Sequence, residues 1–290
     1  MPALSSTASA QGTGGQGSNS GGPNVRSALH GHTATNARGM LRLPMQSTRQ
    51  PSRQTVLRSL PLDRLTPDAR QKIVSVASKP TLYRRLPPQT IACERSMFLF
   101  LTRNPDVLVG LWDLMGITKV KSKRLSTYQI EATDGIGTQC LVDLIYGDAS
   151  QHIFYVEGSY DGKMTPTPIR GKGVFVLRSS YTNTNGKSVV SGSLDCFVQL
   201  DSLGIDLIAR TLSPVIGRSA DSNFEQTAHF IAQVNEASVR NPPAMLNLAG
   251  RLPQVTPPTR ASFADTILQV SRQPLGKVSS NQLSQSRSAR

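Results

Sequence analysis

The sequence predicts an α+β fold in which helices cover an apolar face of an antiparallel sheet. Three observations predict it. Strand-like runs follow one another from about residue 125 to residue 200, with short turns between them. Segments with helical spacing precede and follow these runs. All but one of the Phe, Trp and Tyr residues lie between residues 61 and 240, and large aromatic side chains supply much of a core.

The two ends of the sequence lack the residues that a core needs. Residues 1–55 are rich in Ser, Gly, Thr and Gln, and after residue 241 the sequence returns to Pro, Ser, Arg and Gln. Such compositions are typical of disordered segments. We therefore expect a disordered basic tail at 1–60, a single folded domain at 61–240, and a second disordered basic tail at 241–290.

Positive charge is concentrated in these tails. Residues 1–60 contain six Arg and no acid, and residues 241–290 carry a further +5, which leaves +3 of the total +14 for the domain. A nucleic-acid-binding domain carries its positive charge on the folded part. The composition therefore gives little support for such a domain. It predicts weak, non-specific contact of the tails with anionic surfaces.

Helix-start signals precede the strand region. The triplet Thr-Pro-Asp at 66–68 combines an N-cap residue, a proline suited to the first turn and an acid that favours the helix dipole. Asn-Pro-Asp at 104–106 repeats this signal, and a helix is expected from there to Gly116. Between the two signals, the apolar run 89–101 is typical of a strand.

Turn residues then divide the chain into an antiparallel meander. The clearest signal is at 185–186, because Asn-Gly accepts positive φ at both central positions of a two-residue hairpin turn. A helical pattern follows from Ile205, is interrupted at about 214–217 and restarts at Ser222. The strands themselves are expected at about 125–132, 138–146, 151–160, 172–182 and 187–200.

Three lysines alternate just before the first of these strands. In an extended segment, Lys119, Lys121 and Lys123 place their ammonium groups on one face. Two interpretations stay open. The row either contacts phosphate or membrane headgroups, or forms a charged edge strand that protects the sheet from pairing with other chains.

The sequence contains no recognised catalytic or metal-binding motif. It has no GxSxG, HExxH or Walker loop. Cys93, Cys140 and Cys196 lack zinc spacing and are expected to be small buried side chains. His152, at a strand start, either points into a cavity or is an ordinary hydrogen-bonded histidine. We therefore expect no catalytic residue, no metal site and no cofactor.

The sequence also predicts where the protein resides. The first twenty residues have no apolar run, so no signal peptide is expected. No stretch approaches the ~18 apolar residues that a transmembrane helix needs. We expect a leaderless cytoplasmic protein.

The order of these elements suggests a known superfamily. The stretch SGSLDCFVQLDSLGIDLIARTLSPVIGRSADSNFEQTAHFIAQV at 191–234 resembles the last strand and closing helices of START-like proteins, the SRPBCC or helix-grip group that includes polyketide cyclases. The resemblance covers about residues 88–238. It implies a curved antiparallel sheet wrapped around a long C-terminal helix, with a cavity between them. The superfamily has no universal catalytic residue, so none is carried over.

Two apolar rows are the candidate lining of that cavity. Four side chains alternate onto one face of the last strand, and four share one face of the following helix. They either line a ligand pocket or pack together as solid core. The predicted ligand-binding residues are Leu194, Cys196, Val198, Leu200, Phe224, Ala228, Ile231 and Val234.

The leading functional hypothesis is a non-catalytic binding module whose partner is a hydrophobic small molecule or lipid. Two alternatives stay open. One is an enzyme of the cyclase or aromatase type that uses the same pocket. The other is an interaction protein that acts through its basic tails and needs no pocket.

Overall fold

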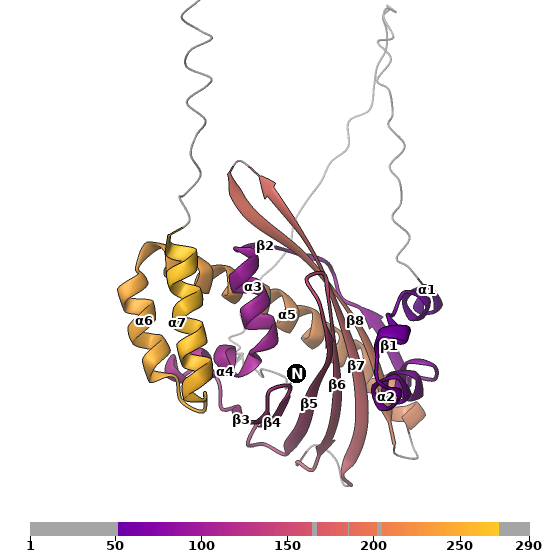
Figure 1. Ribbon diagram of the computed structural model, residues 1–290. Coiled ribbons are helices and arrows are strands. Elements are labelled where there is room, and N and C mark those ends of the chain that lie inside the picture. The colour runs from indigo at the N-terminus through magenta and orange to yellow at the C-terminus, as the bar shows by residue number, and fades with distance from the viewer. Residues whose placement is uncertain (1–51, 164–166, 185, 202–204, 273–290) are drawn as a thin grey trace, which may run out of the picture. The chain divides into compact units, whose positions relative to one another are not determined.

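An antiparallel sheet of eight strands is the central element of the computed structural model, which describes residues 52–163, 167–184, 186–201 and 205–272, without the side chains of 205–218 (Figure 1). The strands lie in the order β1-β8-β7-β6-β5-β4-β3, and β2 also pairs with β8. The sheet is open, which confirms the α+β antiparallel fold. The strands are β1 (Leu82–Arg85), β2 (Gln89–Ala92), β3 (Lys121–Ser126), β4 (Gln129–Thr133), β5 (Thr138–Gly147), β6 (Gln151–Tyr160), β7 (Ile169–Thr184) and β8 (Lys187–Leu200).

The predicted meander is present with one change. β5, β6 and β8 begin and end within one residue of their predicted bounds. Thr184 pairs with Lys187, as a two-residue turn requires, although Asn185 lies outside the described residues. The predicted strand 125–132 is instead divided between β3 and β4, because residues 127–128 form a turn between them.

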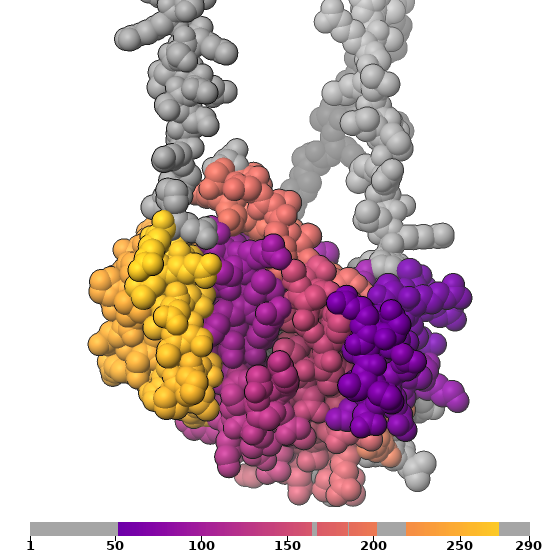
Figure 2. All heavy atoms as spheres, viewed as in Figure 1, coloured from indigo at the N-terminus to yellow at the C-terminus, as the bar shows by residue number. Residues whose placement is uncertain are grey.

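Helices lie on both sides of the sheet. We call the face that packs against the N-terminal helices the outer face, and the opposite one the inner face. In Figure 2 the indigo N-terminal helices and the yellow α7 lie on opposite sides of the strands. The outer helices are α1 (Arg53–Arg58), the 3-10 helix η1 (Leu62–Arg64) and α2 (Pro67–Ala77). The inner side has α3 (Arg95–Arg103), α4 (Pro105–Leu114), α5 (Ile205–Arg240), α6 (Pro242–Arg251) and α7 (Pro257–Ser271).

The outer helices correct the expected N-terminal boundary. The Ser52 side chain accepts a hydrogen bond from the Thr55 N–H at 3.3 Å and begins α1. Val56 and Leu60 are buried with side chains of β6, β7 and β8. The expected tail at 1–60 is therefore wrong from Ser52 onward, and residues 1–51 lie outside the described part of the chain. The helix start at Thr66 is confirmed as the N-cap of α2.

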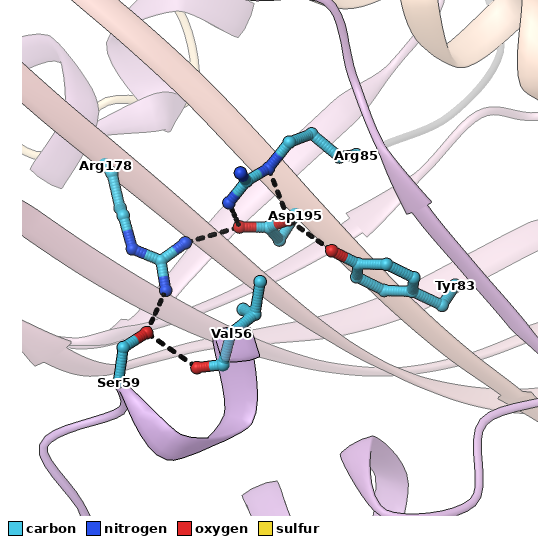
Figure 3. Close-up of polar contacts among 6 residues, drawn as sticks. All are labelled: Val56, Ser59, Tyr83, Arg85, Arg178 and Asp195. Carbon is cyan, nitrogen blue, oxygen red and sulfur yellow. Dashed lines mark hydrogen bonds and ion pairs between the residues drawn. The ribbon is translucent and has the colours of Figure 1, made fainter. Parts of the chain in front are cut away.

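A buried carboxylate on β8, Asp195, ties α1 to the sheet (Figure 3). Asp195 accepts hydrogen bonds from the Tyr83 hydroxyl at 2.8 Å and from two nitrogens of Arg85 at 2.8 and 2.6 Å. Arg178 contacts the second carboxylate oxygen and donates from its other nitrogen to Ser59 Oγ at 2.8 Å. A buried charge needs such partners. Desolvation, followed by the hydrogen bond to Asp195, raises the pKa of Tyr83 to about 12.

On the inner side, the predicted strand 89–101 is wrong beyond residue 92. It divides into β2 and α3. Met97, Phe98 and Leu101 follow helical spacing and are at most 2% exposed. A short apolar run fits both periods, and here packing against α5 and α7 favours the helix. The next predicted helix is confirmed as α4, and Gly116 follows it with a φ of 69°.

Residues 242–271 form two core helices, so the expected disordered tail at 241–290 is wrong over this stretch. The Asn241 side chain accepts from the Ala244 N–H at 3.2 Å and begins α6. In α7, Phe263, Ile267 and Val270 share one face and are 0% exposed. The Phe263 ring stacks on Phe100 of α3 with ring centroids 5.5 Å apart. Residues 273–290 lie outside the described part.

The long helix α5 spans 36 residues without a break. The predicted interruption at 214–217 is therefore wrong, and Ser222 lies inside the helix rather than at its start. The described second half of α5 packs among α3, α4, α6 and α7, and the helix comes closest to the sheet at β1 and β2. The long helix of the helix-grip arrangement is present, but it is followed by two further helices.

The strand β3 lies at one edge of the sheet, and the loop between α6 and α7 packs against it. Gln254 in this loop has a φ of 64°. Its side-chain oxygen accepts from the Ser122 N–H of β3, and its nitrogen donates to Asp113 Oδ2 at 2.7 Å. The edge position of the lysine row agrees with the interpretation of a charged edge strand.

Candidate functional site

The inner face of the sheet presents a continuous apolar surface. Residues paired in antiparallel register share a face, so rows can be followed from strand to strand. One row crosses β5 to β8 at Val142, Val156, Gly173 and Val198, and the next at Leu144, Phe154, Phe175 and Cys196. Leu177 and Leu200 continue the same face along β7 and β8. We call these ten residues the inner floor.

Glycine lets larger side chains lie flat along this floor. A Cβ at Gly173 would lie 2.6 Å from the ring of Phe175, two residues along the same strand. A Cβ at the neighbouring Gly171 would lie 2.9 Å from Leu200 Cδ2. Glycine inside a strand marks such close approaches. The floor is therefore shaped by Phe175 and Leu200 lying across positions without side chains.

Burial differs sharply between the two faces of the same strands. On the outer face, Ile153, Tyr155, Val174, Val176 and Phe197 are 0–3% exposed beneath α1 and α2. On the inner floor, the large side chains of β5, β6 and β7 are only half-buried, as are Val198 and Leu200 of β8. The inner floor therefore keeps more apolar surface in contact with solvent than the part of the outer face beneath α1 and α2.

The structure divides the predicted pocket residues into three groups. Leu194 and Cys196 of β8 pack against Phe224 of α5, with Leu86, in one buried cluster. Val198 and Leu200 lie farther along β8 and are half-buried. The remaining three, Ala228, Ile231 and Val234, are buried in another cluster, with α3, α4, α6 and α7 and with Val190 near the start of β8. The predicted lining is thus divided between two buried clusters and the half-buried end of β8.

The floor residues on β5, β6 and β7 were not among the predicted ligand-binding residues. Both faces of β6 and β7 are apolar, as in Ile153-Phe154-Tyr155-Val156 and Val174-Phe175-Val176-Leu177. Alternation alone therefore does not separate the floor from the outer core. The Asn-Gly signal at 185–186 in the sequence predicts a two-residue connection, and with Thr184 paired to Lys187 the register places Phe175 beside Cys196.

A charged pair lies at the β1 border of the floor. Arg84 of β1 is opposite Cys196 in register, and its guanidinium makes a bidentate contact with the Asp221 carboxylate of α5. The side chains are 40% and 27% exposed. The hydrogen bond to Asp221 raises the pKa of Arg84. The pair fastens α5 to the sheet edge and leaves no net charge there.

His152, at the start of β6, is completely buried and hydrogen-bonded. Arg103 Nε donates to its Nε2 at 3.2 Å, so Nδ1 carries the proton and has no partner among the described groups. Burial, followed by the charge of Arg103, lowers the pKa of His152 to about 4. The histidine is therefore neutral at neutral pH, and of the two interpretations from the sequence the ordinary hydrogen-bonded one applies.

A polar hollow in the surface lies away from the predicted pocket. An open hollow of about 340 Å³ on the outer face is lined by polar groups that include Glu131, Glu157, Arg170 and Lys172. Within the described residues, no group of three or more His, Cys, Asp or Glu side chains could hold a metal ion. None of the helices in that part is long and apolar enough to cross a membrane.

Comparisons with known proteins give similarities of structure alone. No protein-family model and no curated protein matches the chain. Among solved structures, a conserved protein from Geobacillus kaustophilus matches 52% of this chain and 96% of its own, at 13% identity and a TM-score of 0.37. Ara h 8.0201 matches 49% and 97%, at 10% identity and 0.29. Norcoclaurine synthase from Thalictrum flavum matches 48% and 91%, at 13% identity and 0.30. At these values the matches identify neither a family nor a ligand.

Proposed function

We propose that this chain is a non-catalytic binding protein for an apolar or amphipathic small molecule, which lies on the inner floor. The contrast in burial between the two faces of β6–β8 carries the proposal. Apolar side chains in a solid core are fully buried, as they are on β6, β7 and β8 beneath α1 and α2. The half-buried floor offers apolar surface whose removal from water would stabilise a complex.

The closed and open parts of this face suggest where the ligand lies. Leu194, Cys196 and Phe224 pack together and form one end. Val198 and Leu200 belong to the open floor toward the other end of β8. On this proposal the packed end at Leu194, Cys196 and Phe224 limits the ligand site. Val198 and Leu200 contact the ligand. Ala228, Ile231 and Val234 hold α5 in place. The Arg84–Asp221 pair is already neutralised, which favours an uncharged ligand.

The enzyme alternative needs an acid or base that touches the ligand. Two titratable groups of the inner face are Cys140 and His152. Desolvation raises the pKa of the Cys140 thiol and lowers that of His152 to about 4. Both groups are neutral at neutral pH for the same reason, burial. A neutral imidazole is the base form, but the Nε2 lone pair of His152 already accepts from Arg103, which supports binding over proton transfer as the role of the face.

A pair of matched substitutions tests the proposal. Val156 lies on the half-buried inner floor, and Val174, which pairs with its strand neighbour Tyr155, is 0% exposed on the outer face. Both would be changed to Phe in the full chain. Binding of the neutral fluorescent probe N-phenyl-1-naphthylamine and the melting temperature would be measured for each variant. Native mass spectrometry of freshly purified protein would identify any ligand that co-purifies.

The two variants are expected to behave in opposite ways. Val156→Phe should weaken probe binding at least tenfold while it changes stability little, because the ring occupies the ligand space. Val174→Phe should keep probe binding and lose about 1–3 kcal/mol, the usual cost of overpacking a filled core. If the parent binds no probe and both variants lose similar stability, the inner floor is solid core and the proposal is wrong.

A further inference from the structure

Exposed apolar side chains gather on one short segment of the described chain. The described part of the chain has six exposed large apolar residues, and four of them lie within residues 115–128. These are Met115 at 60%, Ile117 at 50%, Leu125 at 46% and Tyr128 at 65% exposed. Single exposed apolar residues are ordinary, but a cluster marks an interaction surface.

The same segment alternates between buried and exposed side chains. Thr118, Val120 and Ser122 are buried, so the residues between them point outward. The outward residues between them are Lys119 and Lys121, and Lys123 after Ser122 continues the row; all three are exposed. Apolar groups therefore lie at both ends of a lysine row, along the edge strand β3 and the turn before it. We call this surface the 115–128 strip; its residues are Met115, Ile117, Lys119, Lys121, Lys123, Leu125 and Tyr128.

Acidic groups beside the strip only partly neutralise it. Lys121 Nζ lies 3.0 Å from Asp113 Oδ2, in a pair whose lysine side chain is 60% exposed. Lys123 lies opposite Glu131 of β4 in register. Exposed pairs of this kind contribute little and are readily exchanged for another anion. Three cations against two acids leave the strip positive.

The backbone of the strip is not offered to a partner strand. The Ser122 N–H donates to the Gln254 side chain, and the Val120 N–H donates to Thr118 Oγ1 at 3.0 Å. An edge whose donors are occupied is protected from strand addition. What the strip presents is therefore side chains, apolar and cationic together.

We propose that the 115–128 strip docks against an anionic membrane surface. In this arrangement Met115 and Ile117 enter the headgroup region, while Lys119 and Lys123 contact lipid phosphates. Each lysine near an anionic surface contributes ~1 kcal/mol, which is about fivefold in affinity, and apolar side chains add to this. Docking at this edge does not depend on whether the inner floor binds a ligand.

Insertion can be measured separately from the attraction of the basic tail sequences. The full chain would carry Ile117→Trp or, as a matched control, Val74→Trp on α2, at a residue outside the strip that is 42% exposed. Vesicles of phosphatidylcholine with about one-third phosphatidylserine would contain acyl chains brominated near the headgroup. We expect quenching of the added fluorescence for Ile117→Trp and not for Val74→Trp. Equal responses of the two variants would overturn the proposal.

Charge reversal gives the second measurement. Lys119→Glu with Lys123→Glu should weaken binding to the same vesicles at least tenfold. Lys79→Glu with Lys187→Glu, at exposed lysines elsewhere, makes the same change in net charge and should have a smaller effect. Equal effects would assign binding to overall charge and overturn the proposal. So would a change of oligomeric state, measured by analytical ultracentrifugation, in the strip variant alone, because the strip would then be a contact between copies of the chain.

Discussion

Replacing Phe263 by Ala tests whether α6 and α7 belong to the folded core. Phe263 is 0% exposed, and its ring stacks on Phe100 with planes 6° apart. Truncating a buried Phe costs about 3–5 kcal/mol through lost burial and the cavity that remains. In a domain of roughly this size, 1 kcal/mol lowers the melting temperature by about 2–4 °C. We therefore expect a decrease of about 6–20 °C.

Thermal unfolding followed by circular dichroism measures this decrease. Ile136→Ala, at a residue 56% exposed, serves as the control and should change the stability by less than ~0.5 kcal/mol. Phe100→Ala and the double variant complete a cycle, in which the two rings should couple by about 0.5–1.5 kcal/mol. If the Phe263→Ala protein has the same melting temperature as the Ile136→Ala control, residues 242–271 are not part of the folded core.

Three further predictions concern polar groups. The pKa of His152 is lowered to about 4 from an ordinary 6.5. The unfolded chain therefore binds more protons than the folded chain between these pH values, and stability falls as the pH falls through this range. The expected loss is about 2 kcal/mol at pH 5. Urea unfolding at pH 7 and pH 5 should show this loss of stability in the parent chain, and the His152→Gln variant should lack it. If the variant loses as much stability as the parent, His152 is not the group responsible. Asp195→Asn should cost ~3 kcal/mol, because two guanidiniums lose their shared carboxylate, whereas Glu236→Gln in the exposed pair with Arg240 should cost under ~0.5 kcal/mol. Asn241→Ala removes the N-cap of α6 and should cost about 1 kcal/mol in the same assay; no loss would mean that the cap is not formed.

Local signals in the sequence were sufficient for the long strands of the sheet, and insufficient for its short strands β1 to β4 and for the ends of the domain. Turn chemistry and alternation placed β5, β6 and β8 within one residue. The prolines after Asn241 and Thr256 were interpreted as signs of disorder, although each follows a cap residue and stands in the first turn of a helix. Counting aromatic residues also failed there, because one Phe with aliphatic neighbours is enough to join an existing core.

The positions of the eight predicted pocket residues followed from the sequence only in part. The alternation in β8 correctly placed Leu194 and Cys196 toward Phe224. It did not show that the next residues of the same helix face pack among other helices, because the surroundings of a helix depend on every element that packs on it. Here α3, α6 and α7 hold Ile231 and Val234, and two of these helices were not expected at all.

The contact between Gln254 and β3 has a consequence for the fate of a shortened chain. A protease cut near residue 241 would remove the side chain that occupies the Ser122 N–H, together with the apolar faces of α6 and α7. The fragment would then present a free strand edge that can template pairing with another copy. Lys121 and Lys123 would be left as the gatekeepers against fibril growth. In this protein the C-terminal helices therefore act against aggregation as well as for stability.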